Sequence, residues 1–552
     1  MKFLMYLRKG AGQALMYALL SFFLFLGACV GLRQAWLVFF VFIPLLYGLQ
    51  NAASLRQSYL TAFFFGCAFH ALVFFWIVNV SWLLFGLAVL VQAFFTGLFG
   101  AGLYFLKQKG RGIKFCLSIA ALWTLTEFVR SSGFWGLPAG LVGYMLAPYP
   151  ALAQPAAWTG VWGLSFWVLL VNASLTEILV SPGIEPFPSF DAGLMESRTN
   201  SNSAKSHLKQ DRRFPRLVAW IVARQNRQTA GCHTSSFRQK AILIFIVGFL
   251  IFVPYLFGKF IIKGIPPLSS LRVTIIQPNI LKEQKKSFEF WPQNFRIYRT
   301  MTETALAAGS SDLVVWPETA VPFFLFHPQR ADILRQIRDV VQTYRRPLLL
   351  GTQDFRQDTS GPHAFNVAVL FSGQGQNIGQ YAKIKLVPIL EYMPVRCLIP
   401  WVRRLGGVGV YEPGREHKIF RVGEAAFSTV ICFEGLFPNL IRKFVRNGAA
   451  IVINMTNDEP SLGRMGFYYR QNAQMLQIRA IENRRSFIRV ANNGVSMVID
   501  PWGRVIREAP AFSRATFTSE VPLSGEKTPF FLFGNWLIWA CLIGLAVRSR
   551  FL

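Results

Sequence analysis

The 552-residue chain is 53% hydrophobic and 15% aromatic, with a mean hydropathy of +0.37 and a net charge of +30. A chain this long and this apolar is not a single soluble domain, so we expect part of it to lie in lipid. Its charge does not indicate nucleic-acid binding, because the sequence has no RNA- or DNA-binding motif. The basic residues instead cluster between apolar runs, as the positive-inside rule predicts.

Cysteine and histidine spacing argues against a metal centre. The seven cysteines include no C-x-x-C pair, and four of them lie in apolar runs: Cys29, Cys67, Cys116 and Cys541. A disulfide framework or a structural zinc site is therefore not expected. The six histidines form no H-x-x-x-H ligand pair. We expect neither a metal nor a cofactor.

Eight apolar runs are each long enough to cross about 30 Å of hydrocarbon. The first resembles a signal peptide, but it is long, no A-x-A site closes it and a second run follows directly, so we expect it to be retained. The runs lie at 11–31, 34–52, 58–78, 81–106, 114–130, 157–181, 241–262 and 528–547. The sequence thus predicts an α-helical transmembrane bundle of about eight spans together with one large soluble segment.

The distribution of Lys and Arg predicts how the chain is oriented. A cytoplasmic N-terminus puts the basic clusters at 107–114, 212–227 and 548–550 inside and leaves few basic residues outside. The predicted organisation is 1–181 as six transmembrane helices, 182–240 as a basic polar cytoplasmic insert, 241–262 as a seventh helix, 263–527 as an extracytoplasmic domain, and 528–552 as an eighth helix with a short basic tail. We expect the insert to lie on anionic lipid.

One predicted span carries two charges near its outer end. Glu127 and Arg130 are three residues apart, so they share one face of a helix. Charges inside a membrane are candidates for function. An ion pair that is purely structural is the alternative, and the sequence leaves both open.

The soluble segment alternates strand-like and helix-like patterns, which indicates an α/β domain with sheets covered on both faces. Strands are predicted at 271–277, 312–317, 347–352, 366–372, 378–385, 427–433, 449–455, 487–492 and 495–500. Helices are predicted at 290–308, 327–345, 436–447 and 464–484.

Three reactive side chains lie at or near the ends of these strands. Glu318 follows Pro317, which ends a buried strand, and burial there would raise its pKa as a general base requires. Alternation along the fifth strand puts Lys383 and Lys385 on one face. Cys432 stands where a buried strand gives way to a helix, a place where a nucleophile is held rigidly.

Taken singly, these residues have ordinary explanations. A lone cysteine is usually a small buried hydrophobe, and a lone Glu or Lys near a strand end is usually a solvated or ion-paired surface residue. Together they suffice for acyl transfer: the carboxylate takes the thiol proton, the thiolate attacks a carbonyl, and the lysine with backbone N–H groups stabilises the oxyanion.

The motifs around the three residues resemble the Glu-Lys-Cys triad of the nitrilase superfamily. They are W-P-E-T-A at Glu318, Y-x-K-x-x-L-V-P at Lys383 and I-C-F-E at Cys432, followed by matching stretches at 454–458 and 479–494. With seven spans before the domain, one after it and T-E-F-V-R at 126–130, the chain is similar to the membrane-embedded branch of that superfamily, the bacterial apolipoprotein N-acyltransferases.

That resemblance implies a nitrilase-like αββα sandwich and a ping-pong reaction without a cofactor. Cys432 would take an acyl chain from a phospholipid donor as a thioester and pass it to the α-amino group of a diacylglyceryl-cysteine on an apolipoprotein acceptor. Glu318 would be the base and Lys383 would stabilise the oxyanion. The enzyme would be a multi-pass monomer of the bacterial inner membrane, with its catalytic domain on the periplasmic side.

Five further residues are implicated by the same resemblance, either in contact with substrate or in support of the triad: Glu391, Glu434, Phe433, Asn366 and Asn457. Glu391 and Glu434 match family carboxylates that orient the triad or the amine. A plain structural role, such as an ion pair with Lys385 or hydrogen bonds to backbone, is the alternative for both.

The sequence departs from the family pattern at four places. Phe433 replaces a tyrosine after the cysteine, and Leu390 replaces a glycine. The loop containing Pro460 lacks an aromatic pair, and the tryptophan expected soon after Q-x-N-I is not in register, the nearest being Trp291. These changes spare the triad, so they bear on substrate preference and rate.

Three other functions compete with acyl transfer to an amine. A membrane-anchored amidase or nitrilase would pass the same thioester to water, because the acceptor depends on how well the pocket excludes water. A catalytically inactive scaffold predicts erosion of a triad that is complete here. A transporter needs polar residues deep in several spans, and this sequence has few.

Overall fold

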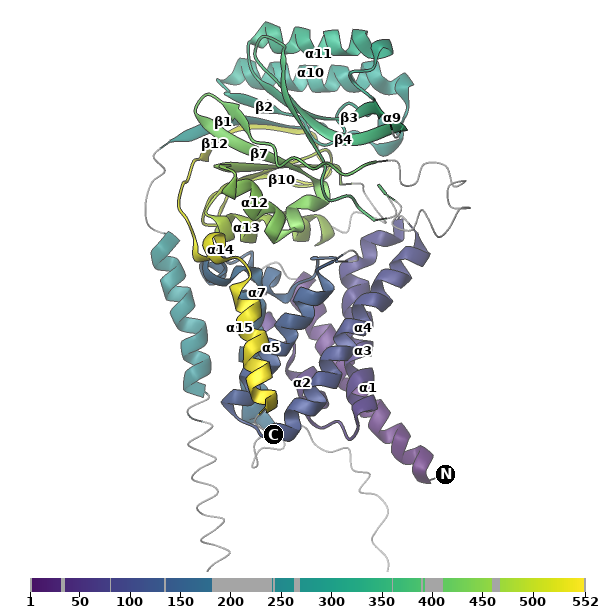
Figure 1. Ribbon diagram of the computed structural model, residues 1–552, viewed down its shortest axis with the longest axis vertical. Helices are drawn as coiled ribbons and strands as arrows, with labels where there is room; N and C mark the ends of the chain where they lie inside the picture. The colour runs from purple at the N-terminus through teal and green to yellow at the C-terminus, as the bar shows by residue number, and fades with distance from the viewer. Residues whose placement is uncertain are drawn as a thin grey trace, which may run out of the picture.

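A computed structural model describes residues 2–30, 35–79, 81–133, 136–180, 241, 244–262, 269–359, 361–388, 391–392, 411–458 and 467–550. The predicted insert at 182–240 and the departures at Leu390 and Pro460 lie outside these residues. The described chain forms a helical bundle with an α/β domain stacked on one end (Figure 1).

Each predicted apolar run contains a helix. The bundle consists of α1 (Lys2–Val30), η1 (Ala35–Phe39), α2 (Ile43–Gln50), α3 (Leu55–Phe74), η2 (Phe75–Asn79), α4 (Trp82–Leu106), η3 (Lys107–Lys109), α5 (Ile113–Arg130), η4 (Val142–Leu146), α6 (Pro150–Ala153), α7 (Ala156–Val180), a helix at Ile244–Ile262, α14 (Pro529–Phe533) and α15 (Trp536–Arg550). Among the described residues, four helices are long and apolar enough to cross a membrane: Leu55–Val78, Trp82–Lys109, Ala156–Val180 and Ile244–Ile262. The count of eight spans stays a prediction.

Two predicted runs are interrupted helices, and local chemistry explains both. The run at 34–52 is split because Pro44 lies in the first turn of α2, where its missing N–H is tolerated, whereas within a continuous helix it would remove a bond. The run at 528–547 is split by Gly534, whose φ of +62° ends α14. Gly160, with φ +68°, likewise kinks α7.

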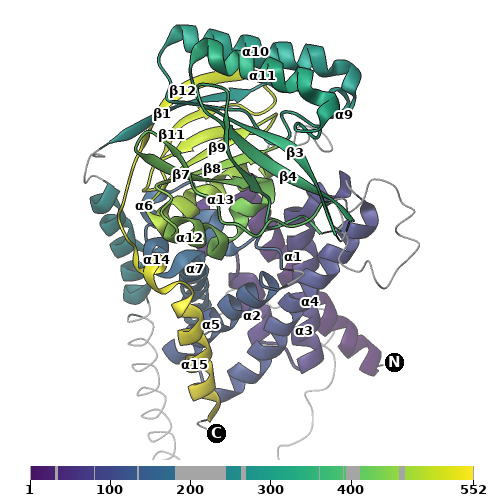
Figure 2. The same ribbon diagram turned by 45° about the horizontal axis from the view of Figure 1, so that its top comes forward.

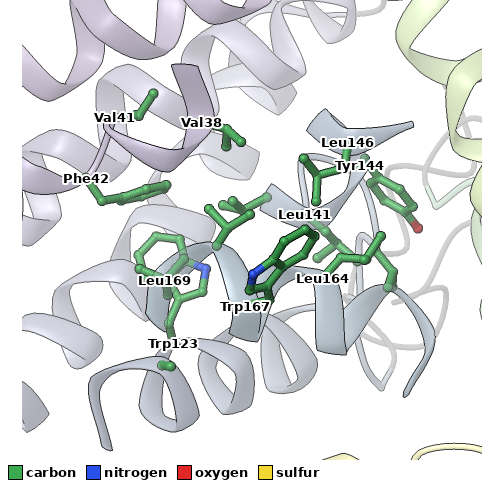
Figure 3. Packing of buried hydrophobic residues seen from close by; sticks show 14 of the residues in the cluster. Val38, Val41, Phe42, Trp123, Leu141, Tyr144, Leu146, Leu164, Trp167 and Leu169 are labelled. Atoms are coloured by element: carbon green, nitrogen blue, oxygen red, sulfur yellow. The ribbon is translucent and has the colours of Figure 1, made fainter. Parts of the chain in front are cut away.

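Large apolar side chains from several helices pack together inside the bundle (Figure 3). This bundle core includes Val38 and Phe42 near η1, Trp123 on α5, Leu146 on η4 and Trp167 on α7, each at most 7% exposed. It extends into the α/β domain, because Phe433, Leu436, Met475, Ile478 and Ile481 belong to the same contiguous cluster.

The α/β domain is a sandwich of two six-stranded sheets. The first has the order β12-β1-β2-β3-β4-β5, with β1 (Ser270–Gln277), β2 (Leu313–Val315), β3 (Leu348–Asp358), β4 (Gly361–Phe371), β5 (Asn377–Ala382) and β12 (Ala515–Pro522). The second has the order β11-β10-β9-β8-β7-β6, with β6 (Phe420–Val422), β7 (Ala425–Ile431), β8 (Ile451–Thr456), β9 (Ser486–Ala491), β10 (Ser496–Ile499) and β11 (Val505–Ala509). Apolar side chains between the sheets form the sandwich core, which includes Val273, Leu349, Val430 and Ile453.

Helices cover both outer faces of the sandwich, as the sequence predicts (Figures 1 and 2). One face carries α10 (Trp291–Ala308) and α11 (Ala331–Tyr344), preceded by α9 (Lys282–Lys286), η5 (Phe288–Phe290) and η6 (Pro328–Arg330). The other carries η8 (Cys432–Leu436), α12 (Pro438–Arg446) and α13 (Phe467–Asn483). The strands β6, β11 and β12 are additions to the predicted set, and each lies at or beside a sheet edge.

Helix α13 joins the sandwich to the bundle. Its Glu482 Oε1 accepts a hydrogen bond from the backbone N–H of Val161, just after the kink in α7, at 2.7 Å. The guanidinium of Arg479 lies 5.5 Å from the ring centre of Tyr144. The side of the sandwich that faces the bundle is thereby fixed to it by polar contacts as well as by the shared core.

Candidate active site

The reactive residues meet because several strands end at one edge of the sandwich. β1, β2 and β3 are parallel, as are β7, β8 and β9, so each set brings its carboxyl ends together. Glu318 follows β2, Cys432 follows β7 and Asn457 follows β8. This convergence joins residues that are distant in sequence.

The turn carrying Glu318 lies against β3 more closely than a side chain would permit. A Cβ at Gly351 would stand 2.7 Å from the Glu318 Cα and 2.6 Å from the Thr319 backbone nitrogen. Thr319 itself has φ +46°. Glycine at 351 is therefore what lets this turn form.

Glu318 is buried, and both of its carboxylate oxygens are held. Oε1 accepts a hydrogen bond from Asn366 Nδ2 at 2.9 Å, and Oε2 accepts one from the Asn457 backbone N–H at 3.0 Å. Burial raises the pKa of Glu318, while the nearby Lys383 cation opposes that rise and Glu391 adds to it. A carboxyl with a raised pKa is suited to accept and return a proton.

Lys383 lies between two carboxylates. Its Nζ donates a hydrogen bond to Glu391 Oε1 at 2.8 Å and stands 3.8 Å from Glu318 Oε1. Burial lowers the pKa of Lys383, but Glu391 and Glu318 outweigh burial and raise the pKa above its usual value. The amine is therefore held as a cation.

The prediction that Lys383 and Lys385 share one strand face is wrong. β5 ends at Ala382, so strand alternation stops before either lysine. Lys383 is buried, whereas Lys385 is exposed with its Nζ 5.7 Å from the ring centre of Phe437. The ion pair of Glu391 with Lys385, which the sequence left open, is not the main contact of Glu391. Its carboxylate instead accepts a hydrogen bond from Lys383.

Cys432 is the first residue of the short helix η8 and has φ +52°, an uncommon conformation for a residue with a side chain. Asn454 Nδ2 donates a hydrogen bond to the Cys432 carbonyl at 3.0 Å. Burial raises the pKa of the Cys432 thiol to about 12, with Glu318 adding to the rise and Lys383 opposing it. The resting thiol is thus protonated at neutral pH and needs a base.

Glu434 holds the segments around the thiol rather than facing open space. Its carboxylate accepts backbone N–H bonds from Ile384, Lys385 and Ile431 at 2.7–2.9 Å and a bond from the Tyr381 hydroxyl at 2.8 Å. These contacts agree with the structural role proposed as an alternative for Glu434, in which its carboxylate accepts hydrogen bonds from the backbone. Burial raises the pKa of Glu434.

The remaining candidates take different positions. Asn366 Nδ2 also lies 3.3 Å from Glu391 Oε1, so it links both carboxylates. Asn457 Oδ1 accepts a bond from Asn492 at 2.9 Å. Phe433 stacks edge-on against Phe437, with ring centres 5.0 Å apart, and belongs to the bundle core.

Two contributors were not singled out from the sequence. Lys285 Nζ donates to the Glu318 carbonyl at 3.0 Å and to Thr319 Oγ1 at 3.1 Å, and its charge opposes the raised pKa of Glu318. Asn492 connects the Asn457 loop to the backbone of Ile280. No local pattern marks Lys285, although Asn492 falls in a stretch that carried the family resemblance.

In the described part of the chain, no group of three or more His, Cys, Asp or Glu side chains is arranged so that it could hold a metal ion.

Both the N-terminal and the C-terminal part of the chain match known protein families. Residues 272–527 match the carbon-nitrogen hydrolase family, and residues 20–174 match the apolipoprotein N-acyltransferase N-terminal domain. An apolipoprotein N-acyltransferase from Geobacter metallireducens is 29% identical over 503 residues, covering 89% of this chain and 86% of the relative. Apolipoprotein N-acyltransferase 2 from Treponema denticola is 28% identical, covering 89% and 87%.

Solved structures that resemble the chain over about half its length include a yeast protein and a bacterial amidase. Nit3 from Saccharomyces cerevisiae, a member of branch 10 of the nitrilase superfamily, has a TM-score of 0.36 and 17% identity, covering 46% of this chain and 91% of its own. An amidase from Nesterenkonia sp. has a TM-score of 0.37 and 17% identity, covering 50% and 98%.

Proposed function

Because the chain belongs to the apolipoprotein N-acyltransferase branch of the carbon-nitrogen hydrolases, we propose that Glu318, Lys383 and Cys432 carry its reaction. The enzyme transfers a phospholipid acyl chain to the α-amino group of the diacylglyceryl-cysteine of apolipoproteins, a step of lipoprotein maturation. The assignment of residues to steps is our proposal.

One observation supports it most directly. Cys432 is partly buried and packs against both the bundle core and the sandwich core. A nucleophile at the junction of a membrane bundle and a catalytic domain can be reached by lipid substrates from the bilayer. A small water-soluble amide needs no such location.

In the first half-reaction, Glu318 takes the Cys432 proton and the sulfur attacks the sn-1 ester carbonyl of the phospholipid. The oxyanion forms near the Lys383 cation, which stabilises it with backbone N–H groups after the cysteine. Collapse breaks the ester bond, and the proton on Glu318 passes to the leaving alkoxide. The products are a lysophospholipid and a thioester on Cys432.

In the second half-reaction, the α-amine of the acceptor attacks the thioester carbonyl. Glu318 removes the amine proton and returns it to the departing thiolate, so the enzyme ends as it began. Glu391 bonds Lys383 and shares Asn366 with Glu318, which supports a role in holding the cation in place. Asn366 and Asn457 hold the Glu318 carboxylate for both steps.

The family is one of inner-membrane enzymes, and this chain has several helices apolar enough to span a bilayer. We place the sandwich on the periplasmic side, with residues 263–527 as the catalytic domain. The basic residues at 107–114 and 548–550, at the end of the bundle away from the sandwich, support this orientation through the positive-inside rule. We expect the enzyme to act as a monomer.

Intact-protein mass spectrometry after incubation with phospholipid tests the assignment. Wild type should gain one hydroxylamine-labile acyl chain, and Cys432→Ser should gain none that hydroxylamine removes. Adding a diacylated lipopeptide should then clear the adduct and yield an N-acyl peptide. Clearance at the same rate without lipopeptide would favour a hydrolase, and no adduct on folded wild type would contradict the proposal.

A further inference from the structure

A cavity of about 580 Å³ lies between α5 and α15. Its basic lining residues, Lys109, Arg111, Lys114 and Arg548, belong to the start of α5 or the loop before it and to the end of α15. Both of these helix ends point away from the sandwich (Figure 1). The cavity is therefore remote from Cys432, which lies where the sandwich meets the bundle.

Two of the basic residues donate hydrogen bonds to backbone carbonyls, which carry no net charge. Lys109 Nζ donates to the Ser549 carbonyl at 3.3 Å, and an Arg548 terminal nitrogen donates to the Gly110 carbonyl at 2.9 Å. Neither bond neutralises a cation. The Nε of Arg548 is buried and has no hydrogen-bond partner among the described residues.

The other two differ in how far they are neutralised. Arg111 donates to Gln50 Oε1 at 2.6 Å and lies 3.7 Å from Glu177, which offsets part of its charge. Lys114 is exposed, and its side chain makes no hydrogen bond or ion pair with the described residues. The end of the cavity that these four residues line, called its mouth below, thus carries an excess of positive charge.

Away from this mouth most of the lining residues are apolar, and Ser118 is the polar exception. Leu117 and Phe166 contribute from the bundle side, and Leu537 and Leu545 from α15. Gly544 faces open space, because a Cβ placed there would meet nothing within 4 Å. A cationic mouth above an apolar channel is complementary to a phosphate joined to an acyl chain.

We propose that this cavity binds one anionic phospholipid, with its phosphate near Lys114 and Arg548 and an acyl chain beside Gly544. Charge complementarity selects this occupant over the basic segment 182–240 of the chain itself, which would be repelled. The lipid binds at the opposite end of the bundle from Cys432, so it is not the acyl donor. Its effect is to hold α15 against α5, and the inference does not depend on the proposed reaction.

Native mass spectrometry of the full-length protein tests the site with three probes: phosphatidylglycerol, phosphatidylcholine with the same chains, and soluble glycerol 3-phosphate. Wild type should retain one phosphatidylglycerol in preference to phosphatidylcholine. Each basic side chain removed should weaken retention about fivefold, so Lys114→Gln with Arg548→Gln should weaken it about 25-fold. Phosphatidylglycerol should also raise the unfolding temperature of wild type and not of this variant.

Two further variants separate charge from shape. Arg56→Gln is the matched control, because Arg56 is exposed at the start of α3, at the same end of the bundle, and does not line the cavity. It should retain phosphatidylglycerol as wild type does. Gly544→Phe keeps every charge and fills the channel, so it should lose the lipid.

Three results would overturn the proposal. Equal retention of phosphatidylglycerol and phosphatidylcholine would show that the cavity binds acyl chains without selecting an anionic headgroup. Displacement of the lipid by glycerol 3-phosphate at equal concentration would indicate a site for soluble anions. Unchanged retention in Lys114→Gln/Arg548→Gln, or equal weakening in Arg56→Gln, would remove the basic mouth from the binding.

Discussion

The sandwich and the bundle each bury a carboxylate beside a cation, yet the two clusters serve different purposes. In the bundle, Glu127 Oε1 lies 3.9 Å from Arg130 and accepts the Val142 backbone N–H at 2.9 Å. Arg130 donates to the carbonyls of Ala139 and Gly140 at 3.2 and 2.9 Å. Ala139 and Gly140 lie in the loop that follows α5, and Val142 begins η4. Arg130 also donates to Gln92 Oε1 on α4 at 3.2 Å, so the pair fastens this segment to the bundle.

In the sandwich, the partners come from the segments that follow two separate strands, β2 and β5. Lys383, Glu318 and Glu391 lie together beside Cys432, and the Glu318 carboxyl has a raised pKa. A cluster that leaves a proton acceptor next to a thiol can do chemistry, whereas one bonded to the backbone of the following segment and to a neighbouring helix holds structure. Burial of charge alone does not distinguish the two, and for Glu127 and Arg130 the geometry favours the structural alternative.

The largest expected effect comes from Glu318→Gln. The amide keeps the shape of the side chain but cannot accept the thiol proton, so acyl-enzyme formation should fall roughly 10²- to 10⁴-fold. The variant should remain folded, because the amide oxygen can still accept from Asn366 or Asn457. Single-turnover mass spectrometry with phospholipid measures the rate. A rate within threefold of wild type would remove Glu318 as the base.

Glu127→Gln should show the opposite pattern. It leaves Arg130 buried without its counter-ion, and breaking a buried pair in this way costs about 3–5 kcal/mol of stability. The rate of acyl-enzyme formation per folded molecule should stay near that of wild type. Thermal unfolding and the single-turnover assay check the two halves of this prediction. Loss of rate in fully folded Glu127→Gln would make the bundle pair functional after all.

Gly351→Ala should impair the active site without touching a charged group. The added methyl would meet backbone atoms of Glu318 and Thr319 at 2.6–2.7 Å, and these cannot move aside cheaply. Overpacking of this kind costs about 1–3 kcal/mol, and the shifted carboxylate should slow acyl-enzyme formation about tenfold.

Gly309→Ala is the matched control for that variant, because a Cβ at Gly309 meets nothing within 4 Å. It should leave both rate and unfolding temperature unchanged. If Gly351→Ala behaved in the same way, the close approach of the Glu318 turn to β3 would not matter for the reaction.

The raised pKa of Glu318 makes activity and stability change with pH in opposite directions. The base works only when ionised, so acyl-enzyme formation should rise with pH above 4.5, the usual value for the group, and level off past the raised pKa. Because the folded state binds this proton more tightly, the group's stabilisation is complete below pH 4.5 and lost as pH rises through the raised pKa. Rate profiles and unfolding temperatures of wild type and Glu318→Gln test this, and a parallel slope in the variant would contradict it.

The sequence was sufficient for the features that depend on local pattern. Buried β-branched runs ending at Pro317 and Cys432 pointed to Glu318 and Cys432 as candidate base and nucleophile. Alternation of strand and helix predicted an α/β domain with covered sheets, and the family resemblance implied the sandwich. It was not sufficient where distant segments meet. Lys285 contacts Glu318 across 33 positions, and Asn492 contacts Ile280 across 212, with no periodicity to reveal either.

The edges of the sandwich and the continuity of the helices were also beyond local pattern. Four of the five residues of β11 are exposed, so its sequence lacks the apolar alternation that marks a buried strand. The apolar runs at 34–52 and 528–547 predicted spans from composition alone, and composition does not register the effect of one proline or one glycine on a backbone.

The smallest expected effect distinguishes two lysines that the sequence placed on one face. Lys385→Met removes an exposed cation near the Phe437 ring, a contact that contributes about 0.5–1 kcal/mol, so its rate should change less than about fivefold. Lys383→Met leaves Glu318 and Glu391 as neighbouring carboxylates with no cation between them, and it should slow acyl-enzyme formation about 10²-fold. Both variants lose one positive charge, so bulk electrostatics cancel in the comparison. If Lys385→Met lost as much activity as Lys383→Met, the oxyanion would be stabilised by the general positive potential of this region, and the ordering of Lys383 by Glu391 would carry no catalytic weight.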